Sequence, residues 1–207
     1  MKYQRKYQER YPGKIFIFTE GSVTEQKYFE KFIEYFKIPQ ARVEVVDRKS
    51  HCFSPKDVLN YVIDFQQDIK KQEPVISKYY DYWLIMDTDR WEKNLYQAID
   101  EAFQRKYSVA VSDPCFEIWY LLHYETALWI TQNSPLLITK SSINTALHAH
   151  NVSGDVSKDF LPHTESAIQE AETLDANKQK RLPEQPGTRV YLLARKLYKL
   201  AGLVVSG

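Results

Sequence analysis

The stretch KIFIFTEGSVTEQKYF, residues 14–29, decides the fold. Its first half is a short run of β-branched and aromatic residues that ends at Glu20 and Gly21, which is typical of a buried strand followed by a tight turn. Its second half begins a series of apolar residues at one-turn spacing, namely Phe29, Phe32, Ile33 and Phe36, which share one face of a helix. The stretch therefore predicts a strand, a turn that carries a carboxylate, and a helix.

The same alternation continues along the first half of the chain. Apolar strand patterns occupy residues 42–46, 82–86 and 107–111, and helical patterns start at Ser54-Pro55 and extend over residues 91–102, with a polar loop at 70–78. Such alternation predicts an α/β fold with a mostly parallel sheet flanked by helices. Further helices are expected over residues 114–124, 141–150, 164–181 and 188–200. We predict a basic segment at 1–13, a core at 14–125, and a helical extension at 126–207 that packs on the core.

The composition excludes several classes of protein. The 207 residues are 43% hydrophobic and 14% aromatic, which is enough for a buried core and too rich for a disordered chain. The net charge of +1 argues against a basic nucleic-acid coat protein. The two cysteines have no metal-ligand spacing, no apolar run reaches the ~20 residues that cross a bilayer, and no secretory signal opens the chain. We predict a cytoplasmic protein with no membrane contact.

Acidic residues follow three of the four predicted strands. Glu20 follows the first strand, Asp87 and Asp89 follow the third, and Ser112-Asp113 follows the fourth. The carboxyl ends of parallel strands form the ligand-binding edge of an open sheet, so these side chains are expected to lie close together. Repulsion between such carboxylates is relieved by a divalent cation, and Mg²⁺ favours one or two carboxylates with waters and phosphate oxygens. The pattern predicts a Mg²⁺ (or Mn²⁺) site.

Several of these acids also fit a purely structural interpretation. Asp89 precedes Arg-Trp-Glu and can cap the third helix, with or without a metal contact. Glu25 stands three residues after Ser22 at the start of a helix, a capping-box pattern, and we favour that function over a catalytic one. Asp113 followed by Pro114 forms a good N-cap and first-turn pair.

The motif SDPCFEIWYLLH, residues 112–123, combines helical and polar features. Glu117 either interacts with the positive end of a helix or approaches the acidic cluster. His123 fits a core histidine better than a catalytic one, and Cys115 fits a small buried apolar residue. The hydroxyl group of Ser112 is a candidate phosphate ligand.

Basic residues gather near both ends of the chain. They lie at positions 2, 5, 6, 10 and 14, and again near the C-terminus, where Arg181, Arg189 and Lys196 are candidate nucleic-acid ligands. Such clusters can hold phosphates, although solvated surface charge is an equally good interpretation of each one.

Four motifs in this order resemble the RloB-like proteins, small prokaryotic proteins often found with restriction-modification and phage-defence loci. The motifs are EGSVTEQKYF, IMDTDRW, SDPCFEIWYLLH and the closing PGTRVYLL, so the resemblance covers nearly the whole chain. The family often has Ser-Asn-Pro where this chain has Ser112-Asp113-Pro114, which leaves the function of Asp113 open.

The resemblance implies a specific fold and activity. RloB-like proteins are similar to the Toprim fold of topoisomerases, primases and overcoming-lysogenisation-defect nucleases. It implies that Glu20 acts as general acid or base, with Gly21 allowing the turn, and that Asp87 and Asp89 hold Mg²⁺. No tyrosine nucleophile can be assigned, so water is the expected nucleophile. The leading hypothesis is a metal-dependent nuclease that acts in anti-phage defence.

Other functions remain open at this stage. The protein can instead be a non-catalytic module that binds a nucleotide or a nucleic acid while a partner protein from a defence locus supplies the cutting. A phosphatase-type domain using Asp87 has less support, and no Gly-Lys-Ser/Thr loop indicates NTP hydrolysis. The sequence leaves open whether the substrate is DNA or RNA and whether the chain forms a homo-oligomer.

Overall fold

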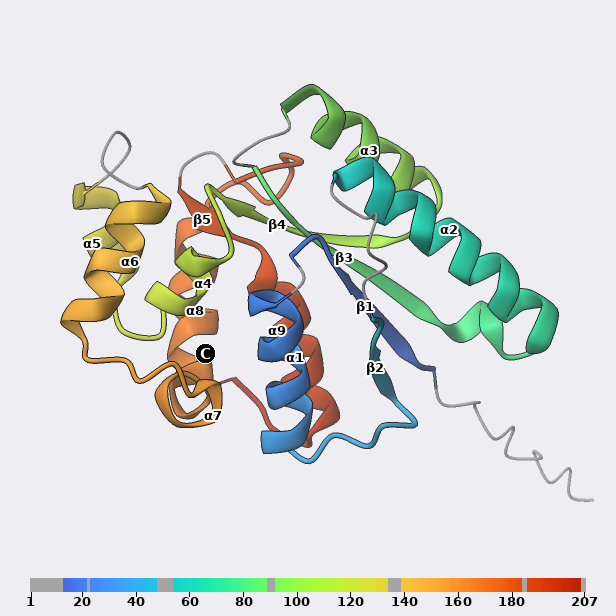
Figure 1. Cartoon of the computed structure of the whole chain (residues 1–207), viewed down its shortest axis with the longest axis horizontal. Coiled ribbons are helices and arrows are strands. Elements are labelled where there is room, and N and C mark those ends of the chain that lie inside the picture. Colours follow the sequence, from blue (N-terminus) through green and yellow to red (C-terminus); the bar gives the residue numbers. More distant parts are fainter. Residues whose placement is uncertain are drawn as a thin grey trace, which may run out of the picture.

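The structure, a computed structural model, describes residues 13–21, 23–47, 54–88, 92–133, 139–183 and 186–205. Within these ranges a single five-stranded sheet forms the centre of an α/β fold (Figure 1). No helix in the described ranges has the length and apolar character needed to span a bilayer.

The sheet has the order β2-β1-β3-β4-β5. The strands are β1 (Ile15–Thr19), β2 (Val43–Val45), β3 (Asp81–Asp87), β4 (Ser108–Asp113) and β5 (Gly187–Thr188). The first four are parallel, as the alternation predicts, and β5 pairs antiparallel with β4. Thr19 is opposite Ile85, and Asp87 is opposite Ser112, so the carboxyl ends of β1, β3 and β4 meet at one edge.

Alternating side chains of the strands serve two separate hydrophobic cores. Phe16, Phe18 and Leu84 pack on one face with α2 (Pro55–Gln72) and α3 (Glu92–Gln104). Ile17 and Ile85 pack on the opposite face with α1 (Thr24–Tyr35), α9 (Val190–Leu200) and the remaining helices (Figure 1). This period-two alternation explains why the strands read as continuous apolar runs, since both faces are buried.

The helix that begins at Pro55 has the predicted start signal. Ser54 accepts a hydrogen bond from the backbone N–H of Asp57, and the Asp57 carboxylate accepts one from the backbone N–H of Ser54. This capping box, with proline in the first turn, satisfies donors that the helix itself leaves unpaired. The predicted loop at 70–78 is partly wrong, because α2 continues to Gln72 and a 3₁₀ turn forms at Ser77–Tyr79.

The second half of the chain is helical, as expected, but its boundaries differ from the prediction. Its helices are α4 (Glu117–Leu121), α5 (Ala127–Asn133), α6 (Lys140–Ala149), α7 (Val156–Asp159), the 3₁₀ turn Leu161–His163, and α8 (Thr164–Leu174). The helix predicted over 164–181 ends at residue 174, because Asp175 leaves the helix and binds Arg189. The helix predicted from residue 188 begins two residues later, because Gly187 and Thr188 extend the sheet.

Candidate active site

The carboxylate of Glu20 lies across the end of the neighbouring strand β3. The backbone N–H of Glu20 donates to the carbonyl oxygen of Ile85 at 3.0 Å, which extends the pairing of β1 and β3 by one residue. The Glu20 carboxylate in turn accepts a hydrogen bond from the backbone N–H of Asp87, with 3.4 Å between Oε2 and N. The first and third strand ends are therefore joined through Glu20. Asp89 lies outside the described residues, and so does its predicted capping function.

Gly21, the residue that follows Glu20, is in close contact with the carboxylate of Glu25. The Thr19 hydroxyl donates to the carbonyl oxygen of Gly21 at 2.7 Å, which holds the turn after β1. A Cβ atom on Gly21 would lie 1.9 Å from Oε2 of Glu25, so a larger residue would force the Glu25 carboxylate to move. Glu25 is 8% exposed and is therefore held in place beside the catalytic candidate.

The capping box predicted for Ser22 and Glu25 stays a prediction. Helix α1 begins at Thr24, and the side chain of its N-cap residue, Val23, forms no cap hydrogen bond. Ser22 lies outside the described residues. Glu25 therefore occupies the second position of the helix, where its carboxylate favours the positive helix end and faces the turn at Gly21.

Glu117 and Lys140 form an ion pair beside Asp87. Nζ of Lys140 lies 2.9 Å from Oε1 of Glu117. Burial raises the pKa of Glu117, but hydrogen bonds from Lys140 and from the Cys115 thiol outweigh it, and the pKa falls below its ordinary value. Burial lowers the pKa of Lys140, but the bond to Glu117 outweighs it and the pKa rises. The Asp87 carboxylate contributes to this rise, so its charge acts on Lys140.

Residues 15–197 match the family model described as RloB-like protein, and this range holds every strand end described above. The chain belongs to the RloB-like family. No curated protein and no solved structure matches it. The RloB-like resemblance of the sequence motifs is thus confirmed at the level of the family, and the α/β sheet is compatible with the predicted Toprim-like fold.

Lys140 is a polar residue of this RloB-like protein that the sequence did not single out. It belongs to the second half of the chain and starts helix α6, where Thr139 and Ser142 form a capping box. No motif surrounds it, and its proximity to Glu117 arises only because α6 packs against α4. The Thr-x-x-Ser helix start was the one local signal for the position of this lysine.

Ser112 and Asp113 contribute to the sheet and not to a helix cap. The Ser112 hydroxyl is fully buried and lies 2.8 Å from the Thr188 hydroxyl of β5, so it is not available as a phosphate ligand. The Asp113 carboxylate accepts a hydrogen bond of 2.5 Å from the Thr88 hydroxyl. The predicted N-cap at Asp113 is wrong because this residue still pairs with β5, and α4 begins only at Glu117.

His123 belongs to the core of this RloB-like protein. Its side chain is 4% exposed, its Nδ1 lies 2.8 Å from the carbonyl oxygen of Trp119, and its Nε2 lies 3.3 Å from the Tyr28 hydroxyl. Burial lowers the pKa of His123 to about 3. The ring is therefore neutral and enclosed, and the structural interpretation replaces the catalytic one.

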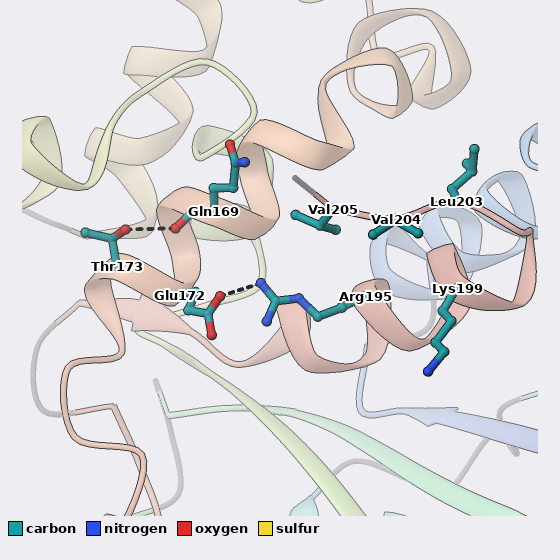
Figure 2. A pocket seen from close by; sticks show the side chains of 8 residues that line it. All are labelled: Gln169, Glu172, Thr173, Arg195, Lys199, Leu203, Val204 and Val205. Atoms are coloured by element: carbon teal, nitrogen blue, oxygen red, sulfur yellow. Dashed lines mark hydrogen bonds and ion pairs between the residues drawn. The ribbon is translucent and has the colours of Figure 1, made fainter. Parts of the chain in front are cut away.

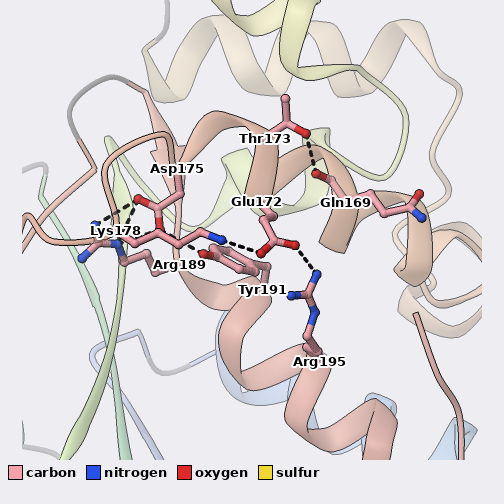
Figure 3. Close-up of polar contacts among 8 residues, drawn as sticks. All are labelled: Gln169, Glu172, Thr173, Asp175, Lys178, Arg189, Tyr191 and Arg195. Atoms are coloured by element: carbon pink, nitrogen blue, oxygen red, sulfur yellow. Dashed lines mark hydrogen bonds and ion pairs between the residues drawn. The ribbon is translucent and has the colours of Figure 1, made fainter. Parts of the chain in front are cut away.

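The three predicted nucleic-acid ligands near the C-terminus do not form one basic surface. Arg189 is 7% exposed and binds the Asp175 carboxylate through both Nε and Nη2, so it is a structural residue (Figure 3). Arg181 pairs with Asp100 of α3, whereas Lys196 pairs with Asp81 at the opposite, amino-terminal end of β3. Of the N-terminal basic residues, those at positions 2–10 lie outside the described residues, and Lys14 pairs with Glu44.

A second polar network surrounds Glu172 in the same region. Arg195 and Lys178 both bind its carboxylate, and these bonds, with that of Arg195 the larger influence, lower the pKa of Glu172 to about 2 (Figure 3). Glu172 and Arg195 also line a cavity of about 790 Å³ between α8, α9 and residues 203–205 (Figure 2). None of the predicted site residues lines this cavity.

The side chains at the strand ends are carboxylates, whose oxygen atoms are the type of ligand that Mg²⁺ binds. Among the described residues, no group of three or more His, Cys, Asp or Glu side chains is placed to hold a metal ion. The Glu20 carboxylate nevertheless lies against the backbone of Asp87, and Mg²⁺ needs only one or two carboxylates when waters and substrate phosphates complete its shell. The residues present therefore fit the ion, with Asp89 as the further predicted ligand beyond the described ranges.

Proposed function

We propose that this RloB-like protein hydrolyses phosphodiester bonds of nucleic acid, DNA or RNA, with Mg²⁺ or Mn²⁺, in defence against phage. The observation that carries the proposal is the contact of Glu20 with the backbone of Asp87 at the carboxyl edge of the sheet. Open α/β sheets bind their ligands at this edge, and the resemblance to RloB-like proteins assigns these two acids to a Toprim-like nuclease site. The defence context rests on the resemblance to RloB-like proteins.

Each described residue of the site has a distinct proposed function. Asp87, with Asp89, holds the metal ion, and Glu20 moves a proton to or from the reacting oxygen atoms. A bound Mg²⁺ polarises the phosphodiester and stabilises the leaving oxygen. The charge of Lys140 attracts a non-bridging phosphate oxygen, and Glu117 fixes the position of that charge through their 2.9 Å contact.

Binding without cleavage, with a partner protein that cuts, is the second candidate function. It is favoured by the positions of Arg181, Arg189 and Lys196, since these three residues pair with acids in different places and do not form one basic path for a long duplex. If this second function is correct, the same edge of the sheet binds a nucleotide or the end of a nucleic-acid strand.

The decisive experiment compares the wild type with Asp87→Asn on DNA and RNA, single-stranded and duplex, with Mg²⁺, Mn²⁺, Ca²⁺ or EDTA. The matched control is Asp64→Asn, which removes an exposed carboxylate of α2. We expect D87N to lose cleavage and D64N to retain it, with equal thermal unfolding of all three proteins. Wild-type rates in D87N would refute the assigned site. A wild type that binds nucleic acid but cuts none of these substrates would favour the second candidate.

A further inference from the structure

A cavity of about 310 Å³ opens next to the candidate active site. Its walls come from the start of α1, from α4, from α6 and from the segment that contains α7, all on one side of the sheet (Figure 1). The side chains that matter for its chemistry are Val23, Glu117, Tyr120, Asn144, Leu147 and Phe160. Its volume is at the lower end of the range for small-molecule sites, which suits one nucleotide unit better than a larger ligand.

Two features connect this cavity with the strand ends. Glu117, which lines the cavity and is bound to Lys140, follows the end of strand β4 at Asp113 by four residues. On the other side, Val23 and Thr24 line the cavity and follow the turn at Gly21 by two and three residues. The cavity therefore borders the segments that follow the carboxyl ends of β1 and β4, where phosphodiester hydrolysis is proposed.

The walls combine aromatic and aliphatic surface with a few polar groups. The rings of Tyr120 and Phe160 are stacked, with 4.1 Å between centroids and 22° between planes, and Leu147 adds aliphatic surface. Asn144 is exposed at the rim, and its amide makes no hydrogen bond within the described part of the chain. Tyr120 and Phe160 are 8% and 4% exposed and stack on each other, so they give the base an apolar wall and not an open ring face. The Asn144 amide can pair with the edge of a base that enters from the rim.

Basic side chains at the rim of the cavity match the phosphate groups of a nucleotide. Lys27 and His148 line the cavity and are exposed, and neither forms an ion pair within the described ranges. Lys140, bound to the cavity residue Glu117, adds a third basic group nearby. Basic residues around an apolar cavity match a base that enters while its flanking phosphates stay outside.

We propose that this cavity accepts one unstacked base of the substrate, so that the nucleic acid cut by this protein is single-stranded or locally unpaired at the cleavage position. The statement about which substrate is cut rests on the proposed nuclease function. The binding of the base, in contrast, can be measured without cleavage. A base inside a duplex cannot enter a cavity of this size unless it leaves the stack, which costs free energy that an unpaired strand does not require.

The test uses the full chain in EDTA, where no cleavage occurs. Binding of the nucleoside 5′-monophosphates is measured by calorimetry and compared with ribose 5-phosphate and inorganic phosphate. Asn144→Trp fills the mouth of the cavity from an exposed helix position. The matched control is Thr145→Trp, at the next, equally exposed position of α6, which does not line the cavity. Thermal unfolding of both variants checks that the fold is retained.

We expect at least one nucleotide to bind about tenfold or more tightly than ribose 5-phosphate, because the base buries apolar surface in the cavity. N144W should remove this difference and T145W should preserve it. With Mg²⁺, the wild type should cut single strands faster than duplexes, and N144W should lose that preference. Equal binding of nucleotides and ribose 5-phosphate, or equal behaviour of N144W and T145W, would overturn the inference.

The two proposals fail in different ways. If nucleotides bind as expected but the wild type cuts no nucleic acid, the cavity assignment stands and the nuclease proposal falls. If the wild type cuts through Asp87 but shows no contribution of the base to binding, the nuclease proposal stands and the cavity assignment falls.

Discussion

Lys140 of α6 and Glu117 of α4 form an ion pair, with 2.9 Å between Nζ and Oε1, that links the helical half of the chain to the end of strand β4. The lysine side chain is 52% exposed and the glutamate side chain 13%, so the pair has one end in solvent and the other in the protein. This arrangement places a positive charge near Asp87, in a region where carboxylates otherwise dominate.

Replacing Lys140 tests whether that charge serves catalysis. We expect Lys140→Met to lower the cleavage rate about 10²-fold, as removal of one preorganised electrostatic group does, and Lys140→Arg to recover part of it. Stability should change by only about 0–1 kcal/mol, because the pair is partly solvated. Cleavage rates and urea unfolding measure the two effects, and a loss of rate that merely parallels a large loss of stability would contradict the assignment.

The same variant should change the titration of Glu117. Because Lys140 helps to hold the pKa of Glu117 below its ordinary value of 4.5, that pKa should rise in K140M. The lowered pKa stabilises the fold at neutral pH, and this contribution is lost as the pH falls below the ordinary value. The difference in stability between the wild type and K140M should therefore narrow in acid. Carboxyl NMR titration of Glu117 checks the direction, and an unchanged pKa would refute it.

Gly21 and Glu25 should behave as a coupled pair. Gly21→Ala places a methyl group where the Glu25 carboxylate lies, so we expect lower activity and about 1–3 kcal/mol lower stability. In a Glu25→Ala background the space is free, and the same change at Gly21 should have little further effect on stability. A double-mutant cycle by urea unfolding measures this coupling. Additive effects of the two substitutions would show that the contact does not matter.

His123 should make the protein less stable in mild acid. Its pKa in the folded protein is about 3, because of burial, whereas an unfolded histidine titrates near 6.5. Between these values the unfolded chain binds one more proton, so the free energy of unfolding should fall by up to about 1.4 kcal/mol per pH unit as the pH is lowered. His123→Gln should remove this slope. Parallel stability curves of the two proteins from pH 6.5 to 4 would contradict the prediction.

Arg189 should matter for stability and not for nucleic-acid binding. Arg189→Met leaves the buried Asp175 without its charged partner, so we expect a loss of about 3–5 kcal/mol. The control Arg181→Met, at an exposed position, should change the free energy of unfolding by at most about 0.5 kcal/mol. Chemical denaturation measures both, and similar values for the two variants would show that the buried pair contributes little.

Local patterns were sufficient to predict the strands and the edge at which the acids meet. The first strand is recognisable from Ile15 to Phe18 because both faces of the sheet are buried and the run is apolar throughout. Glu20 and Asp87 could be paired in advance, because the ends of parallel strands share one edge. These predictions depend only on neighbours in the sequence and on the general geometry of parallel sheets.

Predictions that depend on tertiary contacts were less successful. The Ala-rich and Glu-rich pattern of 164–181 favours a long helix, but the buried bond between Asp175 and Arg189 ends it at residue 174. The pairing of Lys140 with Glu117 joins residues that are 23 positions apart and have no motif in common. The Ser-x-x-Glu pattern places Glu25 at the third helical position, whereas the helix starts at Thr24 and Glu25 is its second residue, close to Gly21.

The placement of α9 has a consequence for the synthesis of the protein. Leu193 and Leu197 of this helix are fully buried in the same core as Ile17 of the first strand, so that core cannot close until residues near 200 have left the ribosome. At ordinary rates of translation, the strands wait on the order of ten seconds with one apolar face uncovered. During that interval the nascent chain exposes a surface that chaperones bind, and slower translation of the segment between β4 and the end of α9 should increase its tendency to aggregate.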